Sequence, residues 1–218
     1  MPPSRFADLA TTPRPHLDEL ALALAAEFQP VDADRAGATL DALAAEVETA
    51  AGAADEPGRQ LEALVDVLAH RHGFEGDTER YDDPENSMLD VVLERRRGLP
   101  ILLSVVYVEV ARRAGISLAP VGLPGHFVCA HVDSDPPLFI DPFNRGAAMQ
   151  VTARSGFHAW SAHETAMRML NNLVASYTRR GDVGRALRAA ELRLALPSGD
   201  ADRARNEFEL RALRARLN

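Results

Sequence analysis

One apolar segment, Ile101–Ala114, constrains the fold of this 218-residue chain more than any other sequence feature. The preceding Pro100 favours a helix start, because the N–H that proline lacks has no partner in a first helical turn. Gly115 follows the segment, and glycine is the residue that most often ends a helix. Since the segment is apolar on almost every side, it predicts a central helix that is buried all around.

Directly after this helix the period of apolar residues changes from that of a helix to two. Three short segments alternate in this way, with Pro-Gly and Asp-Ser-Asp-Pro-Pro turns between them. They are Ser117–Gly122, Phe127–Val132 and Leu138–Asp141. A buried helix followed by consecutive short strands predicts an α+β fold whose core holds a small antiparallel sheet.

Helical patterns precede this core, after an irregular, proline-containing arm over residues 1–15. They predict helices over 17–28, 33–51 and 61–73. The polar segment Phe74–Ser87 has no period and predicts a loop. Its end supplies Asn86 or Ser87 as the N-cap of a helix expected over Met88–Arg97.

From about Ser161 the helical period returns and continues to the end of the chain. Two helices joined at Gly181-Asp182 predict an α-hairpin with the small-residue pattern of one tetratricopeptide-type unit, and a last helix follows. We therefore expect three regions along the chain. They are an N-terminal helical region, a core and a helical tail, at residues 1–72, 73–158 and 159–218.

Composition excludes several classes of protein. The net charge of −8 argues against a nucleic-acid partner, because neutralising phosphates needs a basic face. All 24 basic residues are arginine, which excludes a lysine Schiff base and a P-loop. No apolar run is long enough for a membrane span, and no secretion signal opens the chain. We therefore expect a cytoplasmic protein that does not bind membranes.

His126 and Asp141 are the main catalytic candidates. His126 opens one predicted strand and Asp141 closes another, so a hairpin would let the carboxylate orient the imidazole. Cys129, the only cysteine, lies three residues beyond His126. The two side chains therefore point to opposite faces of one strand, and Cys129 is predicted to be an inert core residue. The histidines show no ligand spacing, so we expect no metal and no cofactor.

Four sequence strings resemble the SirB-type branch of the transglutaminase-like superfamily. They are NSMLDVVLERRRGLP from Asn86, YVEVARRAG from Tyr107, VGLPGHF from Val121 and FIDPF from Phe139. RMLNNL from Arg168 and YTRRGD from Tyr177 resemble the tetratricopeptide-like tail of that branch, so the resemblance covers roughly residues 15–200.

This resemblance implies a papain-related core. In active superfamily members a cysteine begins the central helix, and a histidine and an aspartate follow on successive strands. His126 and Asp141 take the last two places, but Pro100 stands at the place of the cysteine. The resemblance therefore implies a protein without the nucleophile.

Three interpretations stay open. The first, which we favour, is a non-catalytic protein that binds a protein or peptide in a cleft near Pro100 and His126. The polar residues expected around this cleft are Asn86, Glu94, Arg97 and Asn144. The second is a hydrolase or transferase acting on amide bonds, with the His126–Asp141 dyad and either Ser104 or water as nucleophile. The third is a structural module in which the dyad only stabilises the sheet.

Overall fold

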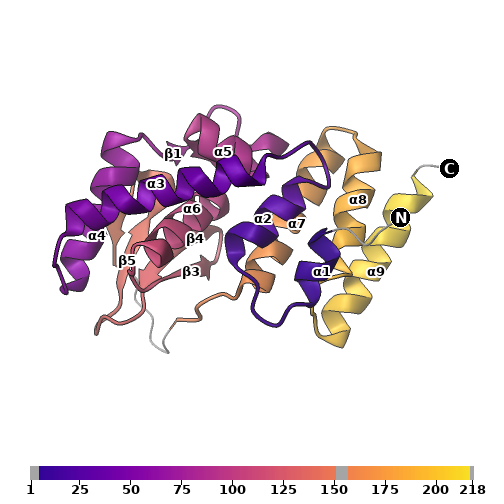
Figure 1. Ribbon diagram of the computed structural model, residues 1–218. Coiled ribbons are helices and arrows are strands. Elements are labelled where there is room, and N and C mark those ends of the chain that lie inside the picture. The colour runs from indigo at the N-terminus through magenta and orange to yellow at the C-terminus, as the bar shows by residue number, and fades with distance from the viewer. Residues whose placement is uncertain (1–4, 151–156, 217–218) are drawn as a thin grey trace.

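The computed structural model describes residues 5–150 and 157–216. The apolar segment forms helix α6 (Pro100–Arg113), with Pro100 in its first turn, and every residue from Pro100 to Ala111 is buried. Helices α3 (Ala33–Ala51) and α5 (Leu89–Arg95) pack against α6 on one side, and the sheet packs on another (Figure 1). The predicted α+β fold with a buried central helix is confirmed.

The main sheet is antiparallel, with its strands in the order β3 (Leu118–Leu123), β4 (His126–His131), β5 (Leu138–Asp141) and β6 (Ala147–Met149). The first three strands confirm the prediction. The short β6 was missed, because Ala147–Met149 lacks the alternation of a half-buried strand.

The two faces of this sheet have different neighbours. On one face, Phe127, Cys129 and Ile140 join the main core with α6. On the other face, Val128 and Phe139 belong to a separate, smaller apolar cluster. Side chains that alternate along β4 therefore enter two different environments, as the period of two requires.

A two-stranded parallel ladder pairs β1 (Glu75–Gly76) with β2 (Arg97–Gly98), and β2 leads directly into α6. The prediction of a loop over 74–87 is thus wrong at both ends, since a 3-10 helix, η2 (Pro84–Ser87), occupies its last residues. Gly76 lies against the ring of Phe143, where an added Cβ would come within 2.4 Å of a ring carbon.

Because η2 takes up Asn86 and Ser87, neither caps α5, and Met88 holds the N-cap position without a side-chain hydrogen bond. The predicted arm is also partly wrong, because helix α1 (Arg5–Thr11) forms there and buries Phe6 and Ala10. Prolines on both sides of α1 concealed so short a helix in the sequence.

The remaining N-terminal helices are α2 (Leu17–Ala25) and α4 (Pro57–Val65), and a π-helix, η1 (Asp66–Arg71), continues α4. The tail consists of α7 (Ala162–Arg179), α8 (Val183–Arg193) and α9 (Asp200–Ala215). Helix α2 packs beside α7 (Figure 1). Just after α2, the ring of Phe28 stacks on that of Tyr177, with 5.6 Å between their centres.

Candidate functional site

His126 and Asp141 are in direct contact at the ends of two adjacent strands. The Nε2 atom of His126 lies 2.7 Å from Oδ2 of Asp141. Because a carboxylate only accepts hydrogen bonds, Nε2 carries the proton and donates it. The contact expected from the sequence is therefore present, and it sets the orientation of the imidazole ring.

Asp141 is held in place by its own turn. It is the N-cap of the 3-10 turn η3 (Pro142–Asn144), and its Oδ1 accepts from the backbone N–H groups of Phe143 at 3.0 Å and Asn144 at 3.3 Å. The side-chain Nδ2 of Asn144 donates to Oδ2 at 2.5 Å. The carboxylate, only 4% exposed, is thus supplied with donors independently of His126.

The other ring nitrogen of His126, Nδ1, has no hydrogen-bond partner within the described part of the chain, and the side chain is 27% exposed. A second histidine provides a contrast. His72 is similarly exposed, at 23%, and its Nε2 contacts Glu46 at 2.9 Å, but its Nδ1 contacts Nη1 of Arg96 at 2.8 Å. His72 thus uses both ring nitrogens inside the protein, whereas Nδ1 of His126 has no partner among the described residues.

Neither candidate nucleophile on the chain can reach a substrate in this structure. Cys129 is completely buried, and burial raises the pKa of its thiol to about 12, so the reactive thiolate is not populated. Its Sγ approaches the backbone oxygen of Ser104 at 3.7 Å, on the face of β4 opposite His126. Ser104 is also completely buried, and its Oγ has no partner among the described residues.

Two of the predicted binding residues, Pro100 and Asn86, occupy structural positions. Pro100 is buried in the first turn of α6, where Leu99 is the N-cap. The N–H of Leu99 donates to the backbone oxygen of Asn86 at 3.2 Å, and Nδ2 of Asn86 donates to the backbone oxygen of Arg80 at 2.7 Å. Asn86 therefore fixes the segment before η2 against the start of α6.

Arg97 connects to the dyad through residues that the sequence analysis missed. Its Nη2 lies 2.6 Å from Oε1 of Glu75, and the second carboxylate oxygen of Glu75 lies 3.1 Å from Nη1 of Arg145. Arg145 follows Asn144, which contacts Asp141. Glu75 and Arg145 are 70 residues apart, so only the position of Arg145 directly after the FIDPFN string could have drawn attention to it.

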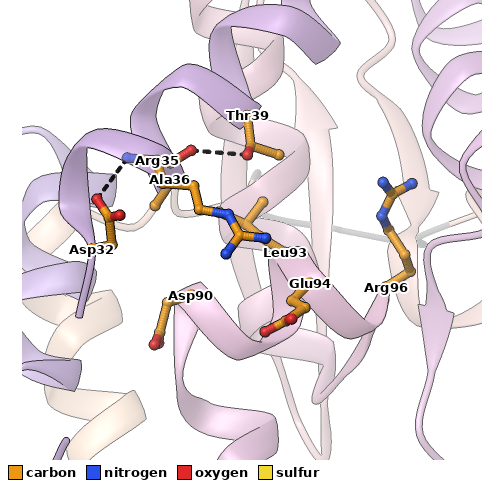
Figure 2. A pocket seen from close by; sticks show the side chains of 8 residues that line it. All are labelled: Asp32, Arg35, Ala36, Thr39, Asp90, Leu93, Glu94 and Arg96. Carbon is orange, nitrogen blue, oxygen red and sulfur yellow. Dashed lines mark hydrogen bonds between the residues drawn. The ribbon is translucent and has the colours of Figure 1, made fainter. Parts of the chain in front are cut away.

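Glu94 lies apart from the dyad and lines a groove of about 330 Å³ between α3 and α5. Figure 2 shows the side chain of Arg35 reaching from α3 toward α5, where Asp90 and Glu94 stand. The structure thus brings His126, Asp141 and Asn144 together, joins Arg97 to them indirectly, and leaves Glu94 in a separate groove.

Across residues 5–150 and 157–216, no three His, Cys, Asp or Glu side chains gather as a metal ion would require. No helix in the same residues is long and apolar enough to cross a membrane.

Comparison with known proteins gives a family match over most of the chain. Residues 34–188 match the family model described as "Transglutaminase-like superfamily". A "UPF0162 protein" of Xylella fastidiosa is 45% identical over 87 residues, and another of Vibrio cholerae is 30% identical over 102 residues. The "F-box only protein 21" of Mus musculus is 31% identical over 141 residues.

These matches are partial on both sides. They cover 40%, 46% and 56% of this chain, in the same order, and 31%, 37% and 22% of the relatives. The chain thus spans well under half of the length of the curated relatives that it matches. No solved structure matches it.

Proposed function

This chain belongs to the transglutaminase-like superfamily, and we propose that it is a non-catalytic member, of the SirB-type branch, which binds a protein or peptide around His126. One observation carries the proposal. The imidazole is oriented by Asp141 and presents Nδ1, while the only cysteine is buried on the opposite face of the strand. A site that keeps its orienting groups without a nucleophile is suited to binding.

The geometry indicates what His126 would recognise. In the tautomer with the proton on Nε2, Nδ1 is an acceptor, and a backbone or side-chain N–H of a peptide is a matching donor. The exposed Asn144 lies beside it on Asp141 and can serve a neighbouring polar group. The match to a small part of the longer "F-box only protein 21" supports an interaction module carried within larger proteins.

The first experiment measures peptide binding. Peptides are selected on the wild-type protein from a random 12-residue library, and their affinities are then compared for His126→Ala and His72→Ala. We expect His126→Ala to weaken binding at least tenfold and His72→Ala to leave it unchanged, because His72 has no ring nitrogen available. Equal affinity of the His126→Ala variant and the wild type would contradict the proposal.

A second candidate function is slow amide hydrolysis or transfer, and the unpartnered Nδ1 of His126 is the observation that favours it. This atom could accept a proton from water, although Ser104 is too deeply buried to act as nucleophile. Amide hydrolysis and amine incorporation are therefore assayed for the wild type, His126→Ala and Ser104→Ala. We expect only background from all three. Wild-type turnover that disappears in His126→Ala would establish an enzyme and refute the non-catalytic proposal.

A further inference from the structure

A second surface is a large groove along the tail. It has a volume of about 1040 Å³ and is lined by the segment before α7 and by α7, α8 and α9, the orange and yellow helices of Figure 1. Apolar side chains that line it include Trp160, Met167 and Val174, and polar ones include Arg168 and Arg193. The groove therefore combines apolar contact area with cationic groups.

Buried polar atoms without partners are concentrated in this groove. Eleven buried side-chain nitrogen and oxygen atoms lack a hydrogen-bond partner in the described part of the protein. Four of them belong to residues that line the groove, namely His163 Nε2, Thr178 Oγ1, and Nε and Nη2 of Arg193. Because buried polar groups are nearly always hydrogen-bonded, these atoms need partners that the described chain does not supply.

Arg193 shows what this partner carries. Its side chain is only 4% exposed, and Nη1 is held by Oδ1 of Asn171 at 3.1 Å and by Oε2 of Glu209 at 2.8 Å. The opposite edge of the guanidinium, formed by Nε and Nη2, is the unpartnered one. Two parallel N–H groups on one edge of an arginine match the two oxygens of a carboxylate.

Most charged side chains around the groove form ion pairs within the protein. Four ion pairs within the protein already hold charged groups of the lining, Arg179 with Asp82, Arg205 with Asp202, Glu164 with His158 and Arg193 with Glu209. Arg168 is exposed on the lining and forms no ion pair with any described residue. Arg168 is therefore the one lining arginine without an ion pair among the described residues, and Arg193, which pairs with Glu209 through Nη1, keeps its Nε–Nη2 edge without a partner.

We propose that the groove of α7, α8 and α9 binds a peptide segment of a partner protein through an aspartate or glutamate side chain. The carboxylate accepts hydrogen bonds from Nε and Nη2 of Arg193, and Arg168 adds attraction at the rim. Apolar residues beside the acid pack on Met167 and Val174, which a small free anion could not do. This proposal does not depend on the role of His126.

The test uses a positional-scanning library of heptapeptides that are acetylated and amidated, so that every carboxylate is a side chain. Binding to the intact protein is measured by fluorescence polarisation. We expect enrichment of Asp or Glu at one position with apolar residues beside it. Arg193→Gln should lower the affinity for the best peptide at least tenfold, and Arg193→Lys should lower it less, because lysine keeps the charge but loses the fork.

Two further variants keep the outcome interpretable if Arg193→Gln fails to fold. Arg168→Glu changes only an exposed side chain on the groove and should weaken binding several-fold. Arg211→Gln, an exposed position on α9 outside the groove, should bind as the wild type does. The proposal is overturned if the wild type shows no preference for acidic residues, or if Arg168→Glu binds as tightly as Arg211→Gln. A preference for a free carboxyl terminus without any side-chain preference would also overturn it.

Discussion

Replacing Asp141 should destabilise the fold much more than replacing His126. In Asp141→Ala, four hydrogen bonds disappear, the N-cap of η3 is lost, and the N–H groups of Phe143 and Asn144 lose their acceptor. With about 1 kcal/mol for the cap, which comprises the two backbone bonds, and 0.5–1.5 kcal/mol for each of the two side-chain bonds, the cost is about 2–4 kcal/mol. His126→Ala removes one bond of a partly exposed side chain, so its cost is about 1 kcal/mol.

Urea unfolding, followed by the fluorescence of Trp160, measures both costs. Trp160 is the only tryptophan, and its ring packs edge-on against Phe127 beside His126, with 5.2 Å between centres. Asp141→Asn is a useful intermediate, because its remaining side-chain oxygen can still cap η3. If His126→Ala destabilised the protein as much as Asp141→Ala, the dyad would be a structural device, and the binding role of His126 would lose its basis.

Three further predictions concern stability and reactivity. Cys129 should react with iodoacetamide at neutral pH at least about a thousandfold more slowly in the native state than in urea. The reason is that a thiol with a pKa of about 12 in place of 9.0 has about a thousandth of the thiolate at this pH. Rapid alkylation of the native protein would contradict this prediction. Burial lowers the pKa of His131, an effect that Asp133 partly opposes, so below pH about 6.5 the unfolded chain binds a proton that the native state does not. The free energy of unfolding should therefore fall as the pH drops below this value, and His131→Gln should remove this dependence in urea titrations. Gly76→Ala should lower the free energy of unfolding by about 1–3 kcal/mol, because the added Cβ would overlap the Phe143 ring. An unchanged midpoint of urea unfolding would refute the close contact.

Long segments with a clear apolar period were predictable, because local sequence alone decides which of their faces is buried. The segment before Gly115 became α6, and the three predicted strands became β3, β4 and β5. Short elements were not predictable, since β1, β2 and β6 have two or three residues each. Such strands form only where a distant partner supplies their hydrogen bonds, as β2 does for β1.

For the candidate site, local sequence was enough to predict that Cys129 and His126 point to opposite faces of one strand, because side-chain direction alternates along any strand. It also determined that Pro100, not a cysteine, begins the central helix. The folded chain was needed to show that, among the described residues, Nδ1 of His126 and one edge of Arg193 have no partner, and that Glu94 lines another groove. The physical reason is that periodicity specifies apolar faces, whereas a polar atom is satisfied by groups that folding brings from far away in the sequence.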